Sequence, residues 1–228
     1  MGENKRAVKD YNQALKIEPK NIIIWRELGN IQTVYPTYDL SKAKAAWKKA
    51  IEIEPENPEN AHVYSALGYY NSMRSPKNGL PFYSKAVELD PSNPFYYFKR
   101  AQALNDKGEY QEAIADYSKA IEIDSQYADS YNNRGLAKEE LGDYLGAIAD
   151  YSKAIKIGSQ KGDDFFAPRT YQNRGIAKRK LRDNQGACID VKKARSLGYR
   201  PSVGTHSKGY GSPEWFKSKE GDWCLNMK

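Results

Sequence analysis

The sequence predicts an all-α protein built as a solenoid of helix–turn–helix units, and three observations carry this prediction. The same pattern of small and aromatic residues at helical spacing recurs in GEYQEAIADYSKAIEI (108–123) and GDYLGAIADYSKAIKI (142–157). These two segments lie 34 residues apart, a period typical of helical repeat arrays. Short turns with glycine or asparagine divide the units, and prolines such as Pro19, Pro55 and Pro91 stop helices between them.

The recurring pattern has a physical reason. Two helices that cross closely need small side chains at the contact, and a nearby aromatic ring fills the adjoining hole. A single such helix cannot bury its apolar face alone, so each unit depends on the next. We expect buried stripes at Ala7–Tyr11–Ala14, Ala43–Trp47–Ala50, Gly79–Tyr83–Ala86, Ala113–Tyr117–Ala120, Ala147–Tyr151–Ala154 and Ala187–Val191–Ala194.

Composition excludes some classes of protein. No apolar run approaches the roughly 20 residues of a transmembrane helix, and the polar N-terminus is not a signal peptide. Two cysteines are too few for a disulfide scaffold. Cys188 follows a stripe alanine, so we expect it to be a buried thiol; a bridge to Cys224 is the alternative.

The unit resembles the tetratricopeptide repeat, a helix–turn–helix of 34 residues. Its signature positions are an aromatic residue in the first helix and a small residue four positions later. The aromatic positions are Trp25, Tyr64, Tyr97, Tyr131 and Tyr171, and the small ones are Gly29, Gly68, Ala101, Gly135 and Gly175. The segment NRGLAKEELGDYLGAIADYSKAI resembles repeats of cyanobacterial and plastid proteins. The resemblance implies a right-handed superhelical solenoid.

The resemblance divides the chain into an array at 1–198 and a C-terminal segment at 199–228. We expect an orphan second helix (about 3–18) and five repeats, at about 22–55, 61–91, 94–125, 128–159 and 168–198. Longer turns are expected at Tyr35–Leu40, Glu56–Asn60 and Ser159–Ala167. The C-terminal segment is expected to be a loop followed by a short capping helix, Pro213–Lys219, in which Trp215 and Phe216 cover the end of the array.

No catalytic arrangement stands out. The two histidines, His62 and His206, lie in different regions, and neither is placed as in a triad. The sequence has no CxxC pair, no HExxH motif and no phosphate-binding glycine loop. We therefore expect no enzyme, no cofactor and no metal site.

The resemblance implies that the first helices line a concave groove. Two of the residues expected in this groove are Phe95 and Phe98. The alternative for them is packing against a neighbouring helix or the C-terminal tail. The clamp for a terminal carboxylate found in some chaperone-binding arrays is incomplete, because Ala66 and Phe95 stand where an Asn and a Lys belong. The groove candidates are Arg26, Asn30, Tyr69, Phe95, Phe98, Lys99, Gln102, Asn132, Asn133, Arg169, Gln172 and Asn173. Asn133 and Asn173 are expected to expose their amides on the same side of this groove.

The net charge of +7 is concentrated in the last repeat, where Arg169–Arg200 holds ten Lys or Arg and two acidic residues. A basic surface for anionic ligands would use Lys178, Arg179, Lys180, Arg182, Lys192 and Lys193. A solvated terminal repeat is the simpler interpretation. Arg134 and Arg174, in NNRG and QNRG, are expected to serve repeat packing.

These observations predict a non-catalytic scaffold that binds a protein or peptide in its groove and helps to assemble a multiprotein complex. The alternative is an anion-directed adaptor that binds membrane lipid or RNA through the last repeat, although no element for reading nucleic acid is evident. Self-association through the N-terminal helix is a third class. We expect a cytoplasmic or membrane-peripheral protein, and the start of the chain within a repeat indicates an upstream segment in the natural protein.

Overall fold

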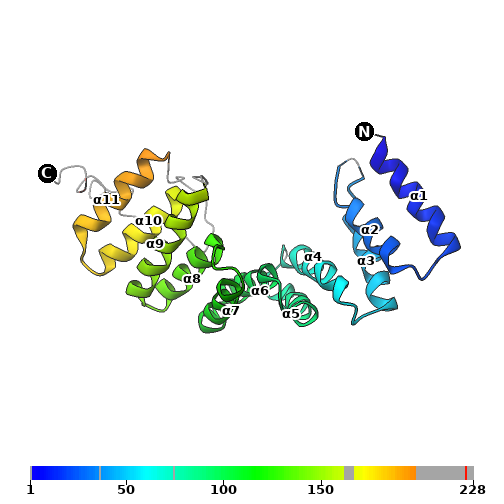
Figure 1. Ribbon diagram of the computed structural model, residues 1–228, viewed down its shortest axis with the longest axis horizontal. Helices are drawn as coiled ribbons and strands as arrows, with labels where there is room; N and C mark the ends of the chain where they lie inside the picture. Colours follow the sequence, from blue (N-terminus) through cyan, green and yellow to red (C-terminus); the bar gives the residue numbers. More distant parts are fainter. Residues whose placement is uncertain (1, 36, 74, 162–166, 199–223, 225–228) are drawn as a thin grey trace. The chain divides into compact units, whose positions relative to one another are not determined.

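The computed structural model describes residues 2–35, 37–73, 75–161, 167–198 and Cys224 (Figure 1). Within these residues the chain forms α-helices joined by short turns and contains no strand. Their bounds are α1 Glu3–Ile17, α2 Ile22–Ile31, α3 Leu40–Ile53, α4 Ala61–Ser72, α5 Leu80–Leu89, α6 Pro94–Lys107, α7 Tyr110–Ile123, α8 Ala128–Glu140, α9 Tyr144–Lys161, α10 Ala167–Lys180 and α11 Asn184–Ser196.

The chain divides into two compact units, Met1–Ala103 and Leu104–Lys228, with the boundary inside α6. In the first unit α1 packs on α2, α2 on α3 and α4 on α5. In the second unit each of the helices from α7 to α11 packs on the next. Consecutive helices therefore form hairpins that stack along the chain, which confirms the all-α helix–turn–helix solenoid (Figure 1).

The predicted stripes are the core of these hairpins. In α7, Ala113, Tyr117 and Ala120 have no exposed surface, and the stripes of α3, α5, α9 and α11 are buried as well. The stripe of α1 is different, because Ala7, Tyr11 and Ala14 are only partly buried. Leu15 is the one buried residue of that helix.

In three hairpins a glycine of the first helix (Gly29, Gly68 or Gly135) lies against an aromatic ring of the second. A Cβ added to Gly135 would lie 2.7 Å from Cε1 of Tyr151, and one added to Gly29 would lie 2.3 Å from the Trp47 ring. Both distances are too short for carbon atoms, and both rings are buried, so the rings cannot move away easily. The glycines at these positions are therefore required by the ring that fills the crossing.

Arg134 and Arg174 hold neighbouring repeats together, as expected. Nε and Nη2 of Arg134, on α8, donate to both carboxylate oxygens of Asp150 on α9, at 2.9 and 2.7 Å, and its Nη1 donates to Ser118 on α7 at 2.9 Å. Arg174 makes the same set of bonds to Asp190 and to Ser152 of the preceding repeat. Each arginine thus joins three helices.

The turns inside the last two hairpins share one backbone geometry. Gly142 and Arg182 both have positive φ, at 80° and 63°. The following aspartate in each turn, Asp143 or Asp183, accepts a bond from a glycine N–H three residues later, at 2.9 and 2.8 Å. Only glycine adopts positive φ without a steric cost, so Arg182 stands in a position that favours glycine.

Two of the three expected long turns are present, between α2 and α3 and between α3 and α4, whereas the third differs in kind. The expected loop at Ser159–Ala167 is partly helical, because α9 continues through Lys161 and α10 begins at Ala167. Residues 162–166 lie outside the described part. The extra turn continues the alanine- and isoleucine-rich face of α9, on which Ile157 is buried.

The N-terminal helix packs on the first full repeat. Leu15 joins a cluster with Leu28 and Ala46, against which Val8 and Tyr11 also pack. Asn4 donates its side-chain amide to the carbonyl of Tyr35 at 3.1 Å.

The two cysteines form a disulfide. Cys188 on α11 is bonded to Cys224, and both are buried. Burial of Cys188 was correctly expected, but its interpretation as a free thiol was wrong: a cysteine 36 positions away cannot be paired from sequence spacing alone. The predicted capping helix Pro213–Lys219, with Trp215 and Phe216, lies outside the described residues.

Ala120→Leu tests the helix crossing. The added carbons have no space in a stripe with no exposed surface, so we expect a loss of about 1–3 kcal/mol in the free energy of unfolding. Ala115→Leu is the matched control, because Ala115 lies on the exposed side of the same helix and should change stability little. Thermal and urea unfolding measure both; equal stability of the two variants would contradict the observed register.

Arg182→Gly should stabilise the protein by up to about 1 kcal/mol, because glycine removes the Cβ that opposes positive φ. Arg182→Ala is the control: it removes the same charge and keeps the Cβ, so we expect no gain. Thermal unfolding compares the three proteins. A similar gain in both variants would attribute the effect to charge.

Intact-mass measurement tests the disulfide. Alkylation of the denatured chain should add no label before reduction and two labels after it. The single variant Cys188→Ser leaves Cys224 unpaired and should take up one label without reductant. Two labels on the unreduced wild-type chain would mean that the bond does not form.

Candidate protein-binding surface

Helix α4 and Met73, the residue that caps its C-terminal end, present two large apolar side chains to solvent. Tyr69 is 50% exposed and Met73 is 61% exposed. They are four residues apart, so they share one face of the helix. The Tyr69 ring lies edge-on to Tyr70, with the ring centroids 5.1 Å apart, and Tyr70 stacks on the buried Trp47. This face is therefore an apolar surface supported by the core, and we call Tyr69 and Met73 the α4 patch.

The two phenylalanines of α6 have different positions. Phe95 is 43% exposed, whereas Phe98 is only 7% exposed. The expectation of an exposed pair is thus wrong for Phe98, and its packing alternative holds. The Lys99 ammonium lies over both rings, 5.2 and 5.5 Å from their centroids, and donates to the Gln102 amide at 3.2 Å.

Two groove candidates of α2 serve the core instead. Arg26 is 5% exposed, and its guanidinium forms an ion pair with Glu59. Asn30 accepts a bond from the Trp47 indole N–H at 3.1 Å. The prediction that these side chains line a groove is wrong for Arg26, because its buried guanidinium reaches Glu59 in the short 3-10 helix Pro58–Asn60 that precedes α4. The partial match to a carboxylate clamp is lost with it.

The expected ladder of exposed amides is not present on α10. Gln172 and Asn173 are 3% and 8% exposed, and Gln172 Oε1 and Asn173 Nδ2 have no hydrogen-bond partner. On α8, Asn133 is half-buried and its amide donates to the carbonyl of Asp129 at 2.8 Å. The expectation that Asn133 and Asn173 both expose their amides is therefore wrong. Arg169, at the start of α10, is exposed.

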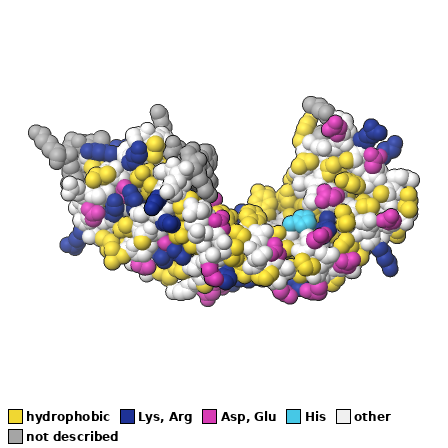
Figure 2. Space-filling model, in the orientation of Figure 1, with side chains coloured by type: hydrophobic (Ala, Val, Ile, Leu, Met, Phe, Trp, Pro, Cys, Tyr) yellow, Lys and Arg dark blue, Asp and Glu magenta, His cyan; other side chains and the backbone are white. Residues whose placement is uncertain are grey.

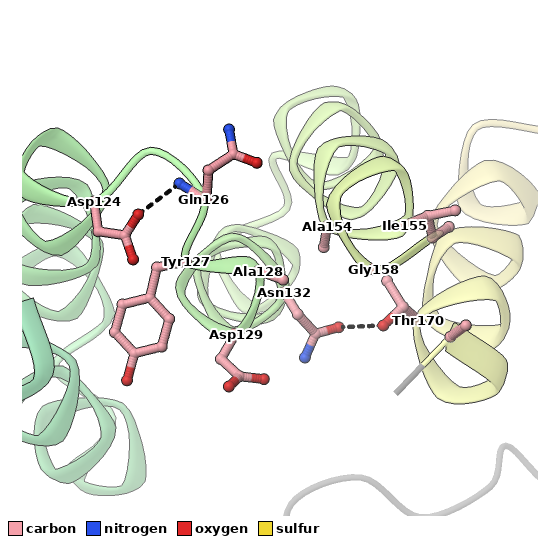
Figure 3. Close-up of a pocket in the computed structure, with 11 residues that line it drawn as sticks. Asp124, Gln126, Tyr127, Ala128, Asp129, Asn132, Ala154, Ile155, Gly158 and Thr170 are labelled. Atoms are coloured by element: carbon pink, nitrogen blue, oxygen red, sulfur yellow. Dashed lines mark hydrogen bonds between the residues drawn. The ribbon is translucent and has the colours of Figure 1, made fainter. Parts of the chain in front are cut away.

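The second unit contains a cavity of about 250 Å³ where α8, α9 and α10 meet (Figure 3). Asp124 and Tyr127 lie on one side of the start of α8, and the backbone of α9 forms the other wall. Asn132, a groove candidate, accepts a bond here from the Thr170 hydroxyl at 3.2 Å. The remaining described residues of the lining are Gln126, Ala128, Asp129, Ala154, Ile155, Gly158 and Ala167. Sequence reasoning found Asn132 but missed the cavity, whose only signal was the long junction after α9.

The basic surface is smaller than the sequence suggests. Lys178 forms an ion pair with Asp190 at 2.8 Å, which Arg174 also contacts, so its charge is neutralised in the repeat. Arg179 is half-buried. Lys and Arg side chains are scattered over the part of the surface built by α8–α11 (Figure 2). The exposed members of the predicted set are Lys180, Arg182, Lys192 and Lys193.

One titratable group with a shifted pKa, Glu139, takes part in packing between helices. Burial raises the pKa of Glu139, and the hydrogen bond from the Tyr151 hydroxyl, at 2.9 Å, acts in the opposite direction. The Tyr151 ring itself fills a helix crossing. Within the described ranges, no group of three or more His, Cys, Asp or Glu is arranged to hold a metal ion. In the same residues no helix is both long and apolar enough to cross a membrane.

Comparison with known proteins agrees with this architecture. Three family models match: one described as TPR repeat at residues 1–33 and 101–142, and two described as tetratricopeptide repeat, at 82–115 and 128–159. The human antiviral innate immune response effector IFIT1 (Homo sapiens) is 34% identical over 77 residues, which are 31% of this chain. This chain spans only 16% of the length of that protein.

Solved structures show the same fold. The crystal structure of MamA has a TM-score of 0.65 and 27% identity, and covers 75% of this chain and 94% of its own. YrrB, described as a TPR protein with an unusual peptide-binding site, has a TM-score of 0.69 at 16% identity and covers 82% and 92%. Repeat signature, stacked hairpins and these matches agree: residues 1–33 and 82–159 match models of the tetratricopeptide repeat, and the fold is that of solved proteins built from this repeat.

Proposed function

We propose that this protein is a non-catalytic scaffold that binds a protein or peptide partner through the faces of its first helices and brings it into a multiprotein complex. The observation that carries the proposal is the α4 patch. Tyr69 and Met73 are large, apolar and at least half exposed, and the Tyr69 ring is supported by Tyr70, which stacks on the buried Trp47. Aromatic residues and Met are enriched in interfaces, and Tyr anchors often dominate binding. The similarity to YrrB, a peptide-binding protein of this fold, supports the same class of function.

The α4 patch can be tested by substitution. A partner is first isolated from the source organism with the full chain and identified by mass spectrometry, and its affinity is then measured by titration. The double variant Tyr69→Ala with Met73→Ala should weaken binding about tenfold or more, because both side chains would lose buried contact area. Thermal stability should remain near wild type, since both side chains are exposed.

The matched control is Leu145→Ala with Ile189→Ala. These side chains are 72% and 61% exposed, but they lie on the second helices α9 and α11. We expect this control to bind the partner as wild type does. Equal losses in both double variants, or no loss in either, would place the binding site elsewhere.

A second candidate function is an anion-directed adaptor that attaches to phosphate-bearing ligands. Its support is the exposed set Lys180, Arg182, Lys192 and Lys193. A salt series separates the two functions: affinity that depends on phosphate contacts falls steeply with added salt, whereas affinity from the apolar α4 patch changes little.

The disulfide bears on location. Disulfides persist in oxidising compartments and are rare in the reducing cytosol. The Cys188–Cys224 bond therefore favours an oxidising compartment over the cytoplasmic location that the sequence suggested.

A further inference from the structure

Helices α3, α4 and α5 of the first unit form an open pocket of about 350 Å³. Part of its lining is apolar and comes from Ala45, Leu67 and Phe82. Leu67 belongs to the core cluster that contains Trp47, and Phe82 packs against the same cluster, so this surface has a fixed position. The pocket is larger than the roughly 150 Å³ of an engineered cavity that holds benzene. An aromatic ring with a polar substituent can therefore enter it.

The other part of the lining is basic. Lys44 and Lys48 both line the pocket, and because they are four residues apart on α3 they lie on the same face of that helix. Among the described residues of the lining there is no Asp or Glu. The pocket thus joins two positive charges to an apolar surface.

The acidic residues of this region are paired with other lysines. Asp39, the N-cap of α3, accepts the backbone N–H of Lys42 at 3.1 Å and forms an ion pair with its ammonium at 3.0 Å. Glu52, one helical turn beyond Lys48, forms an ion pair with Lys49 at 2.6 Å. The two ammonium groups of the pocket therefore keep their charge for a ligand.

Two neutral donors complete the lining. Ser41, in the first turn of α3, contributes a hydroxyl group. The Asn71 amide donates to the carbonyl of Leu67 at 2.7 Å, which uses one of its two N–H groups and holds the side chain against α4. A phosphate monoester carries a charge of about −1.5 to −2 and three acceptor oxygens. It therefore matches two ammonium groups with further donors better than a carboxylate, which carries one charge.

We propose that this pocket binds a phosphotyrosine side chain of a partner polypeptide. The ring lies on Leu67 and Phe82, and the phosphate lies at Lys44 and Lys48. The ring requires the apolar part of the lining and the phosphate requires the basic part, so this one side chain uses both.

The pocket is separate from the α4 patch, so the proposal goes beyond the proposed function. Leu67 and Asn71 line the pocket, whereas Tyr69 and Met73 are each two positions further along α4. Two positions correspond to a rotation of about 200° around a helix, which places the two pairs on opposite sides. A partner could engage either surface without the other.

The test titrates small probes into the full chain while backbone amide signals are followed by NMR. N-acetyl-phosphotyrosine amide should shift the signals of Ser41–Lys48 and Leu67–Asn71. N-acetyl-tyrosine amide lacks the phosphate and N-acetyl-phosphoserine amide lacks the ring, and each should bind about tenfold more weakly or worse. N-acetyl-sulfotyrosine amide has the same shape with a single charge, and it should also bind more weakly than the phosphotyrosine probe.

Substitutions then assign the site. The double variant Lys44→Gln with Lys48→Gln should weaken the phosphotyrosine probe about tenfold or more, because both charged contacts to the phosphate are lost. Lys5→Gln with Lys9→Gln is the matched control. It removes two exposed lysines that are also four residues apart, but on α1, and should leave the titration unchanged. Circular dichroism and thermal unfolding show whether each variant is folded.

Three results would overturn the proposal: no saturable shifts with the phosphotyrosine probe, equal affinity for the phosphoserine probe, or equal weakening in the two double variants. The titration uses no partner protein. Its failure would therefore leave untouched any partner binding that depends on Tyr69 and Met73.

Discussion

The fold depends on how closely the two helices of a repeat can approach. In the hairpins that contain Gly29, Gly68 and Gly135, a ring of the second helix lies where a Cβ of the first helix would be, as with Tyr151 and Gly135. The ring fills the volume at the crossing, and the alanines on either side let the backbones meet. Because the ring and the glycine belong to one hairpin, each repeat sets its own crossing, and stacking on the neighbours then buries what remains of the apolar surface.

Buried ion pairs determine which faces of the helices pack together. The carboxylate of Asp150 is almost fully buried and receives both Arg134 and Lys138. A buried carboxylate is costly unless it is paired and hydrogen-bonded, so such a group tolerates only one arrangement of its neighbours. The alanine stripe favours close contact in general, whereas the arginine network fixes which faces of three helices come together.

Periodic features could be predicted from the sequence, and single side-chain positions could not. The buried stripes and the role of Arg134 and Arg174 follow from spacing, because helical geometry places residues three and four apart on one face. The ion pair of Arg26 with Glu59 and the burial of Asn173 depend on contacts between different helices. The spacing of residues along the sequence does not reveal such contacts. The disulfide and the cavity at α8–α10 also join residues that are 36 or more positions apart, as Thr170 and Asn132 are.

The arginine bonds also bear on how such an array could change in length. Arg134 reaches Ser118, and Arg174 reaches Ser152, which occupies the same position one repeat later. The acceptor on each second helix is thus interchangeable with the next. Deletion of one whole hairpin, α8 with α9, would present Ser118 to Arg174 in place of Ser152 and keep the bond. Loss or duplication of complete units is therefore compatible with the interface, while an insertion of partial length would leave a buried guanidinium without its hydroxyl acceptor.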